Sequence, residues 1–152
     1  AVIARKAGIF GMVGGQSLDV LLTDKPVNEK EMEFIFNLKT GALIEAAFMA
    51  GAILAGAGKE CVSQLEKAGN LVGVAFQIKD DILDVTSTQE VLGKPVFSDE
   101  KNNKTTYVTL YGMEKAAADV ENMSEKAESI VKSIGDNEFL IELINKLISR
   151  EK

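Results

Sequence analysis

Three carboxylates, Asp80, Asp81 and Asp84, lie in the stretch FQIKDDILDV, residues 76–85, whose other members are mostly apolar. Because a helix advances about 100° per residue, Gln77 and these three acids form one stripe on a helix. Like charges this close destabilise a helix unless a cation compensates them. Mg²⁺ binds oxygen ligands and combines one or two carboxylates with waters and substrate phosphates. The stripe therefore predicts one wall of a Mg²⁺–phosphate site.

An amphipathic helix that shows its acids to water is the alternative interpretation of this stripe, since short acidic motifs also occur by chance. In that arrangement Lys79, which projects from the opposite side of the helix, would point into the core. We expect instead that Asp80, Asp84 and Gln77 open onto one cavity and that Lys79 is directed away from it. Zinc is disfavoured as the metal, because the chain has no His and a single Cys.

A phosphate site also needs positive charge from the protein. The polar loop after the stripe supplies Lys94 in GKPV and Lys104 in NNKTTY, with Asp99 between them. Each lysine alone is typical of a solvated surface, but their position directly after the stripe indicates a shared site. Lys39 and Thr40 are a second candidate pair, because they stand at a Gly-marked break in an apolar helix, where polar groups need partners.

The elements that position these residues are predicted to be helices, since the apolar spacing is helical along nearly the whole chain and no alternating strand pattern occurs. Asn28 followed by Glu31 predicts a capping box at a helix start. Residues 86–104 are polar and are expected to form a loop. The fold class is predicted to be all-α, a helical bundle, with helices over residues 1–22 (one, or a pair broken near GMVGG), 28–55 (interrupted at KTG), 59–85, 105–112, 116–134 and 139–147.

Composition limits the classes of function. The 152 residues suit one domain with a core, and a net charge of −6 argues against a nucleic-acid surface. The apolar segment 42–57 contains Glu45 and is shorter than the roughly 20 residues of a spanning helix, so we expect a buried helix and no membrane span. The lone Cys61 is expected at the edge of the core. Without a visible signal-peptide pattern, a cytoplasmic location is predicted.

Four segments of the chain, in order, resemble the trans-polyprenyl diphosphate synthases, and most closely their short-chain, farnesyl-producing branch. FQIKDDILD resembles the second aspartate-rich motif of that family, and GMVGGQSLDV resembles a helix with a Gly-Gln-x-x-Asp pattern. LKTGALIEAA resembles the Lys-Thr helix, and GKPVFSDEKNNKTTY resembles the Gly-Lys…Asp…Lys-x-Thr-Tyr loop, in which Phe97 replaces a residue that is usually small. The resemblance covers about the whole chain and implies the all-α isoprenoid synthase fold.

The resemblance also implies roles for the metal-site residues. Asp80 would ligate Mg²⁺ directly, and Asp81 and Asp84 would act directly or through water. Asp99 would support the water shell of the metal. Asp80 would thereby belong to the catalytic residues.

The substrate site follows from the resemblance in the same way. The diphosphate of an allylic substrate would be held by the basic and polar residues Lys39, Gln77, Lys94 and Lys104. The Thr40 hydroxyl and the main-chain carbonyl of Lys39 would face the allylic carbon, which makes both residues catalytic candidates. Apolar walls such as Phe76 would exclude water, and Gln16 and Asp19 would line the same cavity.

The implied activity is Mg²⁺-dependent condensation of isopentenyl diphosphate with dimethylallyl or geranyl diphosphate to give farnesyl diphosphate, in a full-length enzyme that is a homodimer. The first aspartate-rich motif and the isopentenyl diphosphate site of the family belong to an N-terminal half without a counterpart here. Residues 1–152 are therefore interpreted as the C-terminal portion of a synthase domain, inactive alone. A geranylgeranyl or longer-chain synthase and a non-catalytic regulatory subunit are the alternatives. The retained DDILD and KT favour the enzyme.

Overall fold

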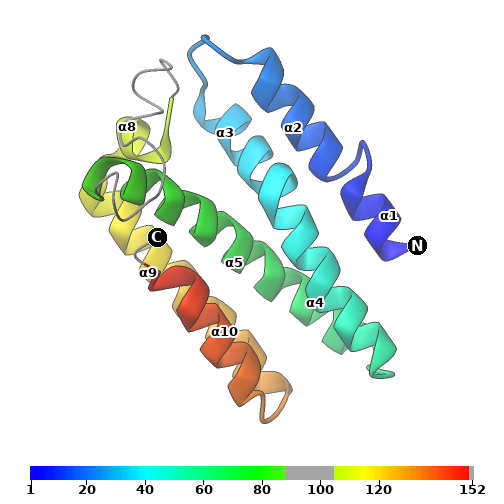
Figure 1. The fold of residues 1–152 in the computed structure, drawn as a ribbon. Coiled ribbons are helices and arrows are strands. Elements are labelled where there is room, and N and C mark those ends of the chain that lie inside the picture. The colour runs from blue at the N-terminus through cyan, green and yellow to red at the C-terminus, as the bar shows by residue number, and fades with distance from the viewer. Residues whose placement is uncertain (88–104, 151–152) are drawn as a thin grey trace.

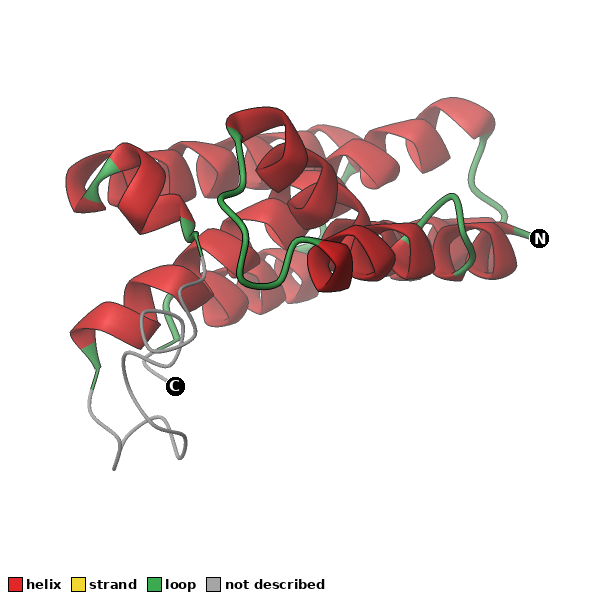
Figure 2. Cartoon of the chain, turned by 90° about the horizontal axis from the view of Figure 1, so that it is seen from above, coloured by secondary structure: helices red, strands yellow, loops and turns green. Residues whose placement is uncertain are grey.

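Helices form the regular structure of residues 1–87 and 105–150, which are the residues that the structure, a computed structural model, describes. In these ranges no strand occurs, as Figure 2 shows from above, so the all-α prediction is confirmed. The order is α1 (Val2–Ala7), α2 (Met12–Leu21), α3 (Glu29–Ile35), a π-helix η1 (Phe36–Gly41), α4 (Ala42–Leu54), α5 (Lys59–Thr86), α8 (Tyr107–Tyr111), α9 (Met113–Ile134) and α10 (Glu138–Ile148).

The long helix α5 is the centre of the bundle. It packs against α4 on one side and against α9 on the other, and α1 and α2 lie against the η1–α4 helix on the side away from α9 (Figure 1). Its buried positions carry small or branched residues, and Ala68, Val72 and Ile78 are fully inaccessible to solvent. One apolar cluster joins α5 to α9 and α10 around Val72 and Ile144, and a second joins it to α3 around Met32 and Ile78. Cys61 packs at the edge of the first cluster, as predicted.

Several predicted element ends are confirmed by their local chemistry. Asn28 and Glu31 form the predicted capping box, with each side chain accepting from the other residue's backbone N–H. The first predicted helix is a pair. The break lies at residues 8–11, so Gly11 precedes α2 as its N-cap, whereas Gly14 and Gly15 lie inside the helix. Helix α9 ends at Gly135, whose φ of 152° is strained for any residue with a side chain.

The interruption predicted at KTG is a π-helix of six residues, Phe36–Gly41, rather than a simple kink. The wider turn lets two neighbouring helices approach its backbone very closely. A Cβ on Gly15 of α2 would overlap the backbone nitrogen of Lys39, and a Cβ on Gly73 of α5 would lie 2.5 Å from the Cα of Gly41. π-Helical turns are rare and occur frequently at functional sites, so η1 marks a candidate site.

The helical run Glu29–Leu54 is long and apolar enough to cross a membrane, as judged by length and composition alone. The run packs along α5 and contacts α1 and α2 in the bundle, and Glu45 within it is buried. Core helices of bundles share the same length and composition, so this feature is weak evidence for a span. The expected absence of a span stays a prediction.

The close approach of α5 to η1 predicts that Gly73→Ala lowers the free energy of unfolding by about 1–3 kcal/mol, because the added methyl group would overpack the contact with Gly41. Gly51→Ala is the matched control, since a Cβ at Gly51 on α4 meets no atom within 4 Å. That change should be neutral or stabilising by up to about 1 kcal/mol. Urea unfolding followed by circular dichroism measures both variants, and equal effects would contradict the prediction.

Candidate functional site

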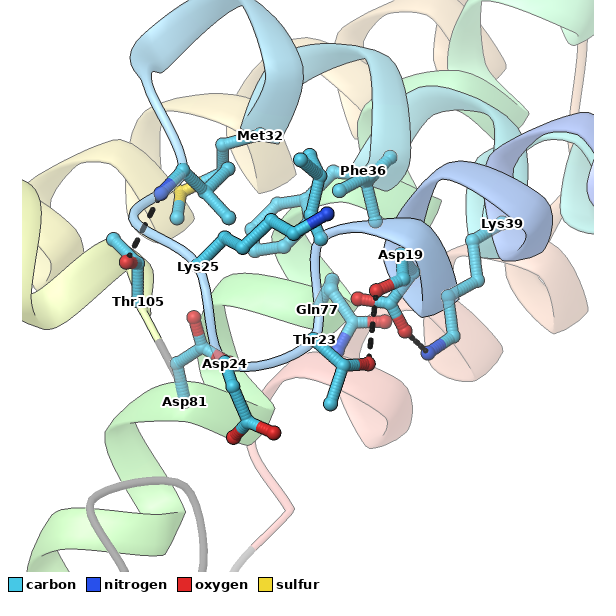
Figure 3. A pocket seen from close by; sticks show the side chains of 13 residues that line it. Asp19, Thr23, Asp24, Lys25, Met32, Phe36, Lys39, Gln77, Asp81 and Thr105 are labelled. Carbon is cyan, nitrogen blue, oxygen red and sulfur yellow. Dashed lines mark hydrogen bonds and ion pairs between the residues drawn. The ribbon is translucent and has the colours of Figure 1, made fainter. Parts of the chain in front are cut away.

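A cavity of about 380 Å³ opens beside η1, between α2, the turn that follows it, α3 and α5 (Figure 3). Charged and polar groups reach it from five segments of the chain: Asp19 from α2, Thr23, Asp24 and Lys25 from the turn after α2, Lys39 from η1, Gln77 and Asp81 from α5, and Thr105 ahead of α8. The apolar part of its lining is formed by Leu22, Val27, Met32, Ile35 and Phe36. The cavity therefore combines an apolar wall with basic, acidic and amide groups.

Lys39 projects from the π-helix to the acid of the neighbouring helix. Its ammonium Nζ lies 2.6 Å from Oδ2 of Asp19 in an ion pair (Figure 3). Both side chains are largely covered, with 30% and 16% of their surfaces exposed. The structure thus brings together two residues that the sequence placed in one site, and an incoming anion would compete with Asp19 for the ammonium group.

Thr40 links the π-helix to the central helix. Its hydroxyl donates a hydrogen bond of 2.8 Å to Oε1 of Gln77 on α5. Lys39 and Thr40 are consecutive residues, yet they contact different helices, one bonding to α2 and the other to α5. Lys39 and Thr40 are therefore each held by a polar side chain that lines the cavity, Asp19 and Gln77 respectively, although Thr40 itself is not part of the lining.

The acidic stripe on α5 divides between two environments. Asp81 lines the cavity together with Gln77, whereas Asp80 and Asp84 are not among the residues that line it. Of the three groups expected to open onto one cavity, Gln77 therefore lines this one, and the common cavity for Gln77, Asp80 and Asp84 stays a prediction. Gln77 and Asp81 are four residues apart and share a face. Asp80 and Asp84 make a second such pair, which is rotated from the first by about 60° around the helix axis.

Asp81 anchors the short helix α8. Its carboxylate accepts a hydrogen bond of 2.7 Å from the backbone N–H of Tyr107, the first residue of α8, and only 5% of Asp81 is exposed. N–H groups at a helix start have no partner inside the helix, and a carboxylate there is stabilising. The Tyr107 hydroxyl donates to Asp119 of α9 at 2.6 Å. Burial, together with this bond, raises the pKa of Tyr107 above its ordinary value.

Arg150 is a functional candidate that sequence reasoning missed. Its guanidinium Nη2 lies 2.9 Å from Oδ1 of Asp80, and the group stacks over the ring of Phe76 at 3.8 Å from the ring centroid. Phe76 therefore lies under a cation and is not part of the lining of this cavity. No sequence pattern relates Arg150 to a motif so far away in the chain.

Two further differences from the sequence concern the rim of the cavity. Lys25, in the turn after α2, lines it and was not predicted, although a lysine in the TDKPV turn was a visible signal. Gln16, which was predicted to line it, is absent from the lining, whereas Asp19 is present. Lys94, Phe97, Asp99 and Lys104 lie outside the described residues.

The acids of α5 supply the type of ligand that Mg²⁺ prefers. Among the described residues, no group of three or more Asp, Glu, His or Cys side chains is arranged to hold a metal ion. Mg²⁺ needs only one or two protein carboxylates when waters and phosphates complete its shell. Asp80 and Asp84, at i and i+4 on one helix, therefore fit such an ion in donor chemistry as one wall of a site.

Comparisons with known proteins agree with the four motifs. The polyprenyl synthetase family model matches residues 3–144. A geranylgeranyl diphosphate synthase from Cyanophora paradoxa is 40% identical over 129 residues, covering 84% of this chain and 43% of that protein. Farnesyl diphosphate synthase from Escherichia coli (strain K12) is 37% identical over 155 residues, covering 99% of this chain and 52% of that protein.

A solved structure gives the same result for the fold. The crystal structure of a geranyltransferase from Helicobacter pylori, complexed with magnesium and isoprenyl diphosphate, superposes with a TM-score of 0.80 at 29% identity, covering 97% of this chain and 49% of that one. The chain thus spans about half the length of the relatives that it matches. The match along most of the chain shows that it belongs to the polyprenyl synthetase family.

Proposed function

We propose that residues 1–152 are the C-terminal portion of a trans-prenyltransferase that condenses isopentenyl diphosphate with dimethylallyl or geranyl diphosphate to give farnesyl diphosphate. The observation that carries the proposal is the π-helix: its Lys39 lines the cavity together with Asp81 of α5, and Thr40, the next residue, bonds to Gln77 of the same lining. A cation for the diphosphate and a hydroxyl for the reacting carbon thereby stand on consecutive residues.

The proposed reaction has three steps. The bond between C1 of the allylic substrate and its diphosphate oxygen breaks, and the electron pair leaves with the diphosphate. The double bond of isopentenyl diphosphate then forms the new carbon–carbon bond to C1. Loss of a proton from the resulting cation restores a double bond. Charge separation in the first step is the difficult part, so groups that stabilise the departing anion reduce its barrier most.

The residues of this chain have distinct tasks in that scheme. Lys39, once its ammonium exchanges Asp19 for phosphate oxygen, would hold the leaving diphosphate. The Thr40 hydroxyl, positioned by Gln77, would lie with its oxygen near the developing cation. The apolar lining around Met32 and Phe36 would keep water from quenching that cation.

Mg²⁺ is the proposed cofactor, and Asp80 and Asp84, with Asp81 nearby, are the residues proposed to hold it. Bound there, Mg²⁺ would stabilise the negative charge on the diphosphate. The magnesium and isoprenyl diphosphate bound by the Helicobacter pylori geranyltransferase support the choice of Mg²⁺ as the metal. Arg150 would have to release Asp80 before the carboxylate could serve a metal. Lys94 and Lys104 are proposed to add positive charge, and Asp99 to support the metal's waters.

The chain length of the product separates two candidate functions. Relatives of nearly equal identity include a geranylgeranyl diphosphate synthase and a farnesyl diphosphate synthase, so a geranylgeranyl product is the second candidate. Product analysis after incubation of the complete protein with isopentenyl diphosphate and geranyl diphosphate decides between them. A non-catalytic regulatory subunit would form neither product. We further propose a cytoplasmic homodimer that acts on small diphosphates, without a membrane span or a nucleic-acid partner.

In the complete synthase, Asp80→Ala should lower kcat by at least about 10²-fold, because metal-assisted stabilisation of the leaving group contributes several kcal/mol. Steady-state assays at saturating Mg²⁺ measure this effect. Glu60→Ala, an exposed carboxylate in the first turn of α5, is the control and should leave kcat unchanged. Wild-type turnover in the Asp80 variant would exclude the role proposed for it.

Asp81→Ala should differ from Asp80→Ala in its effect on stability. Loss of a nearly buried acceptor leaves the Tyr107 N–H without its carboxylate, so the free energy of unfolding should fall by about 1.5–3 kcal/mol. Asp80, whose side chain is 35% exposed, pairs with Arg150 near the surface, and its loss should cost less than about 1 kcal/mol. Urea unfolding of the two variants tests the order, and a reversed order would contradict it.

The 152-residue chain by itself should bind inorganic diphosphate weakly and only with Mg²⁺, and should form no prenyl product. It contains acids and lysines of one wall of the proposed site, and water on the open side would weaken each electrostatic contact. Calorimetry with diphosphate and Mg²⁺ measures the first half, and a product assay with both prenyl substrates measures the second. Robust product formation by this chain would refute the interpretation of it as a partial site.

A further inference from the structure

Asn70 of α5 joins the π-helix to α4 through a single amide group. Its Nδ2 donates one hydrogen bond of 2.8 Å to Oδ1 of Asn37 and another of 2.7 Å to Oε1 of Glu45. Asn37 is the second residue of η1, and its own amide donates to the carbonyl of Glu33 in α3 at 2.8 Å. Asn70 therefore holds a residue near the start of the π-helix.

The same amide lies beside the other end of the π-helix. A Cβ on Gly41, the last residue of η1, would lie 3.5 Å from Nδ2 of Asn70 and 4.0 Å from Oε1 of Glu45. Gly73, about one turn after Asn70 on α5, is the residue that packs on the Cα of Gly41. Polar bonding and backbone packing from one face of α5 thus bracket the segment that carries Lys39 and Thr40.

Glu45, the second acceptor of Asn70, is held in place by an ion pair. Glu45 is only 7% exposed, and its second carboxylate oxygen pairs with Lys6 of α1, which also bonds to Glu66 of α5 at 2.6 Å. Burial alone would lower the pKa of Lys6, but its hydrogen bonds and attraction to Glu45 and Glu66 outweigh that effect and raise the pKa. A buried carboxylate held in this way fixes the orientation of the amide that donates to it.

We propose that Asn70 is a positioning residue for the prenyl transfer proposed above, and that it acts by holding the π-helix in register. A π turn contains one residue more than the α turn that it replaces. If the segment relaxed to α-helix, the residues on one side of it would rotate by about 100° relative to the other side. Lys39 would then leave Asp19, and Thr40 would leave Gln77. Asn70, Asn37 and Glu45 are not among the residues that line the cavity, and their hydrogen bonds go to one another, to Glu33 and to Lys6.

The test uses the complete synthase and the variants Asn70→Ala, Asn37→Ala and the double variant. Each single change should lower kcat about 10- to 100-fold, since small displacements of catalytic groups cost up to about 10²-fold. The double variant should be no slower than the slower single variant, because both changes remove the same hydrogen bond. Gln64→Ala is the matched control: it removes another amide of α5, whose bond goes to Glu60 on the same helix, and kcat should not change.

A purely structural role for Asn70 would give a different pattern. The melting temperature would fall, but kcat per folded enzyme and the Mg²⁺-dependent affinity for inorganic diphosphate would stay at wild-type values. That pattern, or multiplicative losses of kcat in the double variant, would overturn the inference. If Asn70→Ala does not fold, Asn37→Ala, which removes the acceptor of the same bond, carries the same test.

Failure of the proposed function gives a separate signal. If the wild-type synthase forms no prenyl product, the function is wrong, but a crystal structure of the Asn70→Ala variant still reports on the positioning. We expect residues 36–41 in α-helical geometry and the Lys39 ammonium separated from the Asp19 carboxylate. Retention of the π-helix and of that ion pair would refute the inference about Asn70, whatever the reaction is.

Discussion

The contact on which the site depends is the backbone-to-backbone approach of three helices at η1. Gly15 and Gly73 have no side chains, so α2 and α5 can lie directly against the main chain of Lys39 and Gly41. A helix that packs through side chains stands about 8–10 Å from its neighbour. The closer approach brings the polar groups of η1 within hydrogen-bonding reach of Asp19 and Gln77.

Three charged side chains at the site each have a polar or oppositely charged partner. Lys39 is held by Asp19, Asp80 by Arg150, and Asp81 by the start of α8. Each contact compensates a charge that would be costly to leave unpaired in a partly buried place. A diphosphate with its metal would exchange partners within this set rather than bring isolated charges together. The side chains are already oriented in the folded chain, so ligand binding need not order them again.

Sequence patterns predicted the fold class, the capping box at Asn28, the end of α9 at Gly135 and the neighbourhood of Lys39, Thr40, Gln77 and Asp81. These features depend on local periodicity or on short motifs. Patterns failed where the outcome depends on packing between distant segments. The π-helix was expected only as a break, because local patterns do not show how closely α2 and α5 pack against this segment. The place of Phe76 and the partner of Asp80 depended on Arg150, whose position follows from how α10 returns along α5.

The aromatic content of the chain has a spectroscopic consequence. There is no tryptophan, and the two tyrosines both lie on α8, with ring centroids 4.5 Å apart. Tyrosine emission therefore originates from a single short helix whose first backbone N–H is bonded to Asp81. The Tyr107 phenol donates to Asp119, a bond that quenches tyrosine emission by favouring proton transfer in the excited state. If a rearrangement at the acidic stripe displaces α8, the tyrosine fluorescence of the unlabelled chain should therefore change.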